Sequence, residues 1–140
     1  MLSKILHVED DHDIREIALM ALETVGGFTV EQCPSGGDAL TKVRSFVPDL
    51  FLLDVMMPDM SGLETLAELR KMPELADIPA IFMTAKAHPR EVSEFMDAGA
   101  ISVITKPFDP ITLADEIRDI WNARSDHHAD DGHRFSEPTT

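Results

Sequence analysis

Cysteine is nearly absent from this 140-residue sequence: Cys33 is the only one, so no disulfide can form within the chain. Disulfides stabilise proteins of oxidising compartments, and their exclusion favours a reducing cytoplasm. Long apolar runs are absent too, because no stretch approaches the roughly 18 residues of a membrane-spanning helix. The N-terminal apolar stretch within residues 1–8 is too short, and too soon followed by charged residues, to be a signal peptide. We expect a cytoplasmic protein with no membrane partner, in which Cys33 is a small core residue.

Basic residues are scarce as well. Lysine and arginine number 12 against 26 aspartates and glutamates, which gives a formal net charge of -14. Proteins that bind the phosphate backbone of nucleic acids gather Lys and Arg on one face, whereas the basic residues here are scattered. We therefore expect no direct DNA binding. An acidic surface instead suits a protein partner that carries a basic patch.

What the sequence does contain is a regular alternation of two patterns. Short runs typical of strands, either apolar or alternating between apolar and polar residues, occupy residues 4–8, 28–33, 50–54, 80–84 and 101–105. Stretches with helical apolar spacing follow at residues 13–25, 39–46, 62–72, 88–98 and 111–121. This order predicts βαβ crossovers, a parallel sheet and helices on both of its faces. The chain after residue 124 is polar and aperiodic, so we expect one domain over residues 1–124 and a flexible polar tail over 125–140.

One of the strand runs ends in a charged residue. Residues 50–53 are uninterrupted and apolar, as expected for a strand buried on both faces of a parallel sheet. The run stops at Asp54, and Pro58 and Gly62 indicate that the chain leaves the sheet there. Open α/β sheets place their chemistry at the carboxyl ends of such strands. Taken alone, Asp54 is explained equally well as a functional acid or as a solvated strand end.

Other strand ends carry polar residues of complementary kinds. They are Glu9, Asp10, Thr84 and Lys106, beside Asp54. Parallel strands bring these ends to one edge of the sheet, where three carboxylates would repel one another without a counter-ion. A hard divalent cation such as Mg²⁺ relieves that repulsion, because it prefers carboxylate, carbonyl and water oxygens. Lys106 and the Thr84 hydroxyl are suited to an incoming anion.

This combination fits phosphoryl transfer. A carboxylate is a weak nucleophile, so catalysis must come from positioning and from charge neutralisation around the transferred group. We expect the metal and Lys106 to cover two phosphoryl oxygens and Thr84 to cover another. The product would be an aspartyl phosphate on Asp54.

Four motifs resemble the receiver domains of two-component response regulators, the chemotaxis regulators in particular. They are VEDD at residues 8–11, LLDVMMPDMSG at 52–62, MTA at 83–85 and TKPF at 105–108. Each motif alone occurs by chance, but the four in this order, each at a strand end, are specific. The resemblance extends from residue 4 to about residue 124. It implies a flavodoxin-like (βα)5 three-layer α/β sandwich whose parallel five-stranded sheet has the order 2-1-3-4-5.

The resemblance also implies a role for each acid. Asp54 would accept phosphate from the phosphohistidine of a sensor histidine kinase or of a histidine phosphotransfer protein. Asp10 would bind Mg²⁺ directly and Glu9 through water, with Asp54 and the backbone carbonyl of Met56 as further ligands. Such a domain is a phosphoacceptor with slow autodephosphorylation and not a turnover enzyme.

The resemblance implies switch residues as well, with one departure. Lys106 would pair with the phosphate, and Thr84 would be the switch hydroxyl. Family members usually carry Tyr or Phe three residues before the lysine, where this chain has Val103. We therefore expect Val103 to pack in the core and switching to rely on backbone and loop shifts. Met56 and Lys86 occupy the positions that flank the phosphoryl group, and their bulk predicts a long-lived phosphoryl state.

Three functions remain open from the sequence. With no output domain expected after residue 124, the first is a stand-alone receiver that switches protein–protein contacts with an effector or a kinase. The second is a phosphorelay intermediate that passes phosphate to a histidine phosphotransfer protein. The third is a phosphatase of the haloacid-dehalogenase type, which needs a second aspartate two residues after Asp54, where this chain has Met56.

Overall fold

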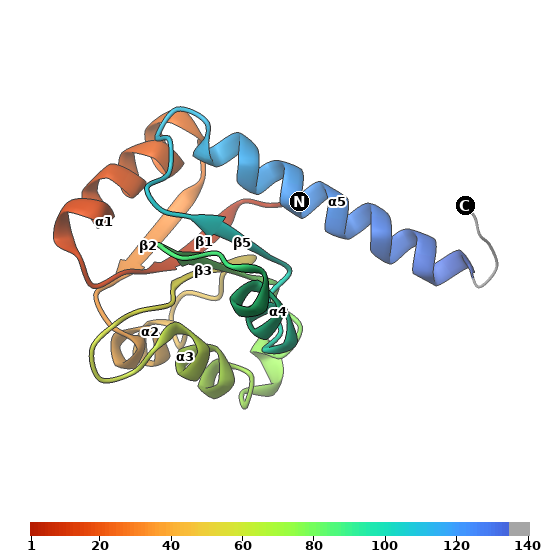
Figure 1. Ribbon diagram of the computed structural model, residues 1–140, viewed down its shortest axis with the longest axis horizontal. Helices are drawn as coiled ribbons and strands as arrows, with labels where there is room; N and C mark the ends of the chain where they lie inside the picture. The colour runs from red at the N-terminus through yellow and green to blue at the C-terminus, as the bar shows by residue number, and fades with distance from the viewer. Residues whose placement is uncertain (135–140) are drawn as a thin grey trace.

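The computed structural model describes residues 1–134 as five strands and their connecting helices in alternation (Figure 1). The strands are β1 (Lys4–Val8), β2 (Thr29–Cys33), β3 (Leu50–Asp54), β4 (Ala80–Thr84) and β5 (Ser102–Thr105). The α-helices are α1 (His12–Leu19), α2 (Gly36–Lys42), α3 (Gly62–Leu69), α4 (Pro89–Asp97) and α5 (Leu113–Arg134). Two shorter helical segments are the π-helix η1 (Met20–Val25), which continues α1, and the 3-10 turn η2 (Pro73–Leu75).

The sheet is parallel, with the strand order β2-β1-β3-β4-β5 that was expected from the sequence. Strand β3 lies at its centre, paired with β1 on one side and β4 on the other. All five residues of β3 are buried. The uninterrupted apolar run before Asp54 is therefore explained by cover on both faces of the sheet.

Two hydrophobic cores, one on each face of the sheet, complete the three layers. One core joins η1 and α5 to the sheet, through residues that include Leu22, Leu52 and Ile117. The other joins α2, α3 and α4 to the opposite face, through residues that include Leu66 and Phe95. Figure 1 shows the two helical layers on either side of the strands. The predicted flavodoxin-like three-layer sandwich is confirmed.

Cys33 and Val103 were both predicted to be core residues, and both pack in or against the core on the α2–α3–α4 face. Cys33 is buried in the core on the α2–α3–α4 face, and burial raises the pKa of its thiol to about 11. Val103, on β5, is half-buried and packs against the same core. Both side chains therefore serve packing, as expected.

Helix α5 is longer than its apolar pattern predicted. It continues to Arg134, past residue 124, where we expected a polar tail to begin. Figure 1 shows its last turns extending beyond the sheet. Hydrophobic periodicity marks only the part of a helix that packs on a core, whereas the backbone hydrogen bonds of a helix are internal and continue without one. Residues 135–140, the rest of the expected tail, lie outside the described residues.

Among residues 1–134, no helix combines the length and the apolar character needed to cross a membrane.

Candidate functional site

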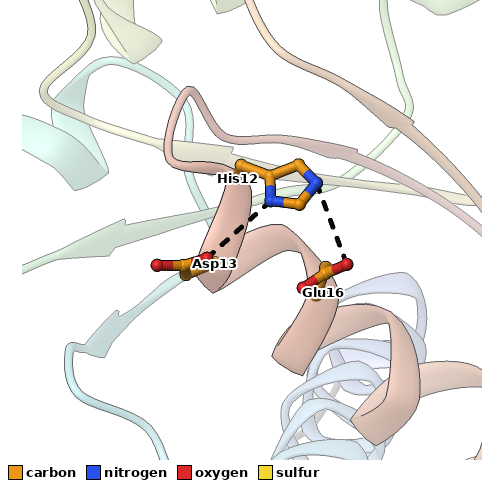
Figure 2. Close-up of side chains that lie close together, drawn as sticks. All are labelled: His12, Asp13 and Glu16. Carbon is orange, nitrogen blue, oxygen red and sulfur yellow. Dashed lines mark ion pairs between the residues drawn. The ribbon is translucent and has the colours of Figure 1, made fainter.

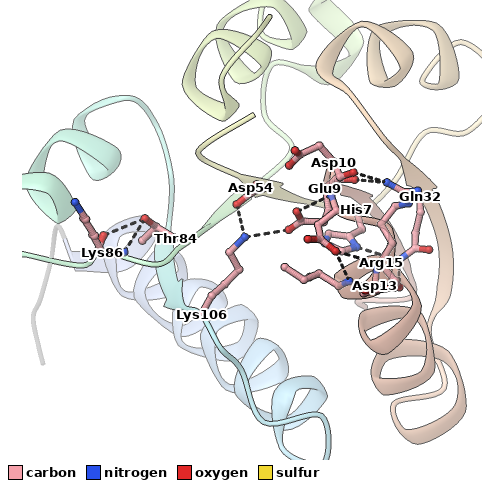
Figure 3. Close-up of polar contacts among 12 residues, drawn as sticks. His7, Glu9, Asp10, Asp13, Arg15, Gln32, Asp54, Thr84, Lys86 and Lys106 are labelled. Carbon is pink, nitrogen blue, oxygen red and sulfur yellow. Dashed lines mark hydrogen bonds and ion pairs between the residues drawn. The ribbon is translucent and has the colours of Figure 1, made fainter. Parts of the chain in front are cut away.

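The carboxyl edge of the sheet holds a compact group of charged side chains (Figure 3). Asp54, the last residue of β3, is 2% exposed. Glu9 directly follows β1 and is 1% exposed, and Lys106 directly follows β5. The parallel order of β1, β3, β4 and β5 brings these residues, which are far apart in the sequence, to the same edge.

Lys106 connects the two buried carboxylates. Its Nζ lies 2.8 Å from Oδ1 of Asp54 and 3.2 Å from Oε1 of Glu9. Both are charge-assisted hydrogen bonds, which are stronger than neutral ones. The second oxygen of Glu9 accepts a hydrogen bond from the backbone N–H of Asp11 at 3.1 Å. One ammonium thus serves as counter-ion to two acids from different strands.

The protonation equilibria of this group reflect its burial. Burial raises the pKa of Asp54, although the hydrogen bond from Lys106 acts in the opposite direction. Burial likewise raises the pKa of Glu9. Burial acts to lower the pKa of Lys106, but its hydrogen bond and charge interactions with the two carboxylates outweigh this, and that pKa is raised. The site therefore favours a bound cation over two bare carboxylates.

The acids fit a divalent cation. Glu9, Asp10 and Asp54 each offer one carboxylate oxygen, and these atoms all lie within 4.8 Å of one another. When all three are ionised they exceed the single charge of Lys106 by two. Asp10 is exposed, which leaves one side of the cluster open for water ligands. Hard oxygen donors with room for water match the coordination preference of Mg²⁺.

Met56 and Thr84 stand apart from this cluster in their contacts. The Met56 side chain is 78% exposed on the loop after β3, and the role of its carbonyl as a metal ligand stays a prediction. Thr84 is buried at the end of β4, where its hydroxyl donates to the carbonyl of Lys86 at 3.0 Å and accepts from the Lys86 N–H at 3.1 Å. In Figure 3 the Thr84 hydroxyl faces Lys86 and not Asp54.

Gly62 allows the loop after β3 to return against the site. Its N–H donates to the carbonyl of Val55 at 2.9 Å. A Cβ at this position would lie 2.2 Å from the carbonyl oxygen of Asp54. Only glycine permits this close approach of the two backbone segments.

Arg15 is a residue of this site that the sequence pattern did not indicate. It lies on α1, and its Nη1 donates to the carbonyl of Glu9 at 2.8 Å and to that of Asp10 at 3.1 Å. Because backbone oxygens are the same in every residue, these contacts produce no motif in the sequence. The one sequence feature that could have indicated Arg15 is its position shortly after the acidic residues 9–11.

Two hollows flank the charged group. One has a volume of about 430 Å³ and is lined by Val55, Met56, Thr84, Ala85, Lys86, Glu91, Glu94 and Phe95. The other has a volume of about 470 Å³ and is lined by Ile14, Ile17, Ala85, Lys106, Pro107, Phe108 and Pro110. The second is almost wholly apolar apart from Lys106, which belongs to both the hollow and the charged group.

A second cluster, His12, Asp13 and Glu16, lies in the first turns of α1 (Figure 2). The two ring nitrogens of His12 are each 3.8 Å from a carboxylate oxygen, one of Asp13 and one of Glu16. All three side chains are exposed, and ion pairs between exposed groups contribute little. This cluster is not part of the buried site.

Comparisons with known proteins agree with the geometry. The response regulator receiver domain model matches residues 5–118. The chain is 38% identical over 130 residues to the transcriptional regulatory protein CseB of Streptomyces coelicolor, covering 93% of this chain and 53% of CseB. It is 34% identical over 118 residues to the phosphate regulon regulator PhoB of Escherichia coli, covering 84% of this chain and 51% of PhoB. The chain thus spans about half the length of these relatives.

A solved structure of a chemotaxis protein is also similar to this chain. The chemotaxis protein CheY4 of Vibrio cholerae superposes with a TM-score of 0.79 at 29% sequence identity, over 86% of this chain and 99% of CheY4. Its fold, the matched family model and the buried Lys106–Asp54 pair all point the same way. The chain belongs to the family of response regulator receiver domains.

Proposed function

We propose that Asp54 is the phosphoacceptor of this receiver and takes its phosphoryl group from the phosphohistidine of a sensor histidine kinase or histidine phosphotransfer protein. The observation that carries the proposal is the position of Lys106, with Nζ 2.8 Å from Asp54 and 3.2 Å from Glu9. An ammonium held between a nucleophile and a metal ligand is already placed to meet the oxygens of a group transferred to Asp54.

During transfer, an Oδ atom of Asp54 forms a bond to phosphorus while the bond from phosphorus to the donor's imidazole nitrogen breaks. The ring leaves as neutral imidazole after taking up a proton, and an aspartyl phosphate results. Mg²⁺, held by Glu9, Asp10, Asp54 and the Met56 carbonyl, would supply neutralisation of charge on the phosphoryl oxygens. Lys106 keeps an anionic partner throughout, first Oδ1 of Asp54 and then a phosphoryl oxygen.

Asp54 is consumed by the transfer and restored when the aspartyl phosphate hydrolyses. The role is therefore that of a switch and not of a turnover enzyme. The hydroxyl of Thr84 can reach the phosphoryl group only by giving up its two hydrogen bonds to the Lys86 backbone. Because Val103 offers no aromatic ring, we propose that this movement of residues 84–86 is the signal that alters protein contacts.

The apolar hollow beside Lys106 supports a protein partner. Ile17 on α1, which is 44% exposed, lies in its lining, and Ile111, which is 69% exposed, directly follows the lining residue Pro110. Exposed apolar groups around a concave site mark interaction surfaces. We propose that an apolar helix of the phosphodonor docks here, which would bring its phosphohistidine to the edge where Asp54 lies.

The proposal is tested by incubating the protein with Mg²⁺ and acetyl phosphate and measuring its mass. We expect one added phosphoryl group, absent when Mg²⁺ is chelated and absent in Asp54→Ala. Asp97→Asn, which changes an exposed acid of α4, should accept phosphate like the wild type. A wild-type protein that gains no phosphoryl group from acetyl phosphate or from candidate kinases would refute the proposal.

A phosphorelay intermediate is a second candidate. It is favoured by similarity to the receiver domain of a signal transduction histidine kinase from Syntrophus aciditrophicus, at 30% identity and a TM-score of 0.73 over 99% of this chain and 97% of that one. A relay would return phosphate rapidly from Asp54 to a histidine phosphotransfer protein, whereas a terminal receiver would retain it. A stand-alone role and a cytoplasmic location stay predictions from the sequence.

A further inference from the structure

Behind the carboxylates, a series of hydrogen bonds joins β1 and β2 to α1 (Figure 3). Nε2 of Gln32, on β2, lies 2.8 Å from the carbonyl oxygen of Arg15 and 3.1 Å from Nδ1 of His7. The Arg15 guanidinium then donates to the carbonyls of Glu9 and Asp10. These contacts end on backbone oxygens or on an uncharged ring, not on the carboxylates that would bind the metal.

The orientation of the Gln32 amide is determined by its partners. A carbonyl oxygen can only accept, so the group that faces the Arg15 carbonyl must be the amide NH2. Its second hydrogen then faces His7, whose Nδ1 is the acceptor. The His7 ring is accordingly neutral, and burial, together with the charges of Lys106 and Arg15, lowers its pKa to about 3. The series therefore has one arrangement of donors and acceptors.

Arg15 contacts the backbone segment that carries two of the proposed metal ligands, Glu9 and Asp10. Glu9 is tied to β2 by its own N–H, which donates to the Cys33 carbonyl at 3.0 Å. Asp10 is exposed and lies beyond the strand. The direction of its carboxylate therefore depends on how the backbone of residues 9–11 is held, and the guanidinium holds two consecutive carbonyls of that segment.

We propose that Arg15 and Gln32 are positioning residues of the Mg²⁺ site: Arg15 fixes the backbone that carries Glu9 and Asp10, and Gln32 fixes Arg15 against His7. Contacts that orient metal ligands without touching the metal change metal affinity. The inference rests on the proposed function of the acidic cluster, which supplies the metal site.

The test is a Mg²⁺ titration of the unphosphorylated protein, followed by the backbone amide NMR shifts of residues 9–11. We expect Arg15→Met to raise the dissociation constant about 10-fold and Gln32→Leu to raise it by on the order of 3-fold, since the latter acts through one more contact. Arg15→Lys should recover part of the affinity, because its ammonium can donate to one of the two carbonyls. At saturating Mg²⁺, phosphate uptake from acetyl phosphate should return to the wild-type rate in all three variants.

Arg70 provides a matched control. Its Nη1 also donates to two backbone carbonyls, those of Leu75 and Ile78. Arg70→Met should lower the melting temperature and leave Mg²⁺ affinity unchanged. If Arg15→Met and Gln32→Leu lose stability in the same way but keep wild-type affinity, their role is structural and the inference is overturned. A wild-type protein that binds no Mg²⁺ would overturn the proposed metal site as well, so the two failures are distinguishable.

Discussion

The hydroxyl of Thr84 is bonded to both backbone polar groups of Lys86: it donates to the carbonyl oxygen at 3.0 Å and accepts from the N–H at 3.1 Å. One side chain thus fixes the turn that leaves β4 beside Asp54, the proposed phosphoacceptor. Any movement of this hydroxyl toward a phosphoryl group releases the turn.

Replacement of Thr84 should therefore separate phosphate uptake from the conformational response. In Thr84→Ala the turn loses two hydrogen bonds, which we expect to cost about 1–2 kcal/mol of unfolding free energy. The mass assay should still detect phosphorylation of Asp54, but the amide shift of Lys86 should change much less on phosphorylation than in the wild type. Thr84→Ser, which keeps the hydroxyl, is the control. An unaltered Lys86 response in Thr84→Ala would exclude Thr84 as the switch.

Lys106 should make the protein sensitive to alkali. Its folded-state pKa is raised above the ordinary value of 10.5, so the stability that it contributes is complete below that pH and is lost as the pH rises through the folded pKa. Urea unfolding of the wild type should reveal a decrease above about pH 10.5 that Lys106→Met lacks. Lys71→Met, which changes an exposed lysine, should decline as the wild type does. Parallel curves for wild type and Lys106→Met would contradict the expectation.

His7 should make the protein sensitive to acid. Its folded-state pKa is lowered to about 3 from 6.5, so its contribution to stability is complete above 6.5 and is lost as the pH falls toward 3. We expect the wild type to lose about 2 kcal/mol between pH 7 and pH 5 relative to His7→Leu, which cannot titrate. Chemical denaturation at the two pH values measures this difference. An equal loss in both proteins would mean that His7 is not the source.

Gly62 should not tolerate a side chain. A Cβ there would lie 2.2 Å from the Asp54 carbonyl oxygen, so Gly62→Ala forces the loop away from β3. We expect a loss of about 1–3 kcal/mol, with slower phosphorylation of Asp54. Gly37→Ala is the matched control: on α2 its Cβ would meet nothing closer than 3.9 Å, and removal of a helical glycine should be neutral or stabilising. Wild-type stability of Gly62→Ala, measured by thermal unfolding, would contradict the close approach.

Met56 and Lys86 should set the lifetime of the phosphoryl state. Both line the hollow of about 430 Å³ that also holds Thr84, where bulky side chains would impede an attacking water. We expect Met56→Asn and Lys86→Glu each to change the rate of phosphate loss several-fold. A time course of intact mass after removal of the phosphodonor measures this rate, with Met20→Asn, which changes an exposed residue of η1, as control. Unchanged lifetimes in both variants would exclude this role.

The convergence of Glu9, Asp54 and Lys106 could be anticipated from the sequence, because strict alternation of strands and helices makes the sheet parallel and all strand ends then share an edge. The charges and residue types at those strand ends then predicted a site for a divalent cation and an anion. The direction of the Thr84 hydroxyl could not be anticipated, since it depends on the local turn after β4. The proposed roles of Arg15 and Gln32 could not be anticipated for a related reason: their partners include backbone oxygens, which every residue carries.

The length of α5 was missed for a different reason. Apolar spacing identifies the face of a helix that packs on a core. In α5 this face includes Leu113 and Ile117, which pack against the sheet. The helix continues beyond this face to Arg134, over polar residues whose sequence shows no helical periodicity.

Because Lys106 bonds to two carboxylates at once, the resting site already contains a cation tethered to its own chain. A metal ion entering from solution has to compete with a charge whose local concentration is fixed by the fold. Under the proposed function, this competition sets how much free Mg²⁺ the site needs, because Lys106 neutralises only one of the three carboxylate charges before the metal binds. The shared lysine would then make phosphate uptake depend on the supply of free Mg²⁺ as well as on the proposed phosphodonor.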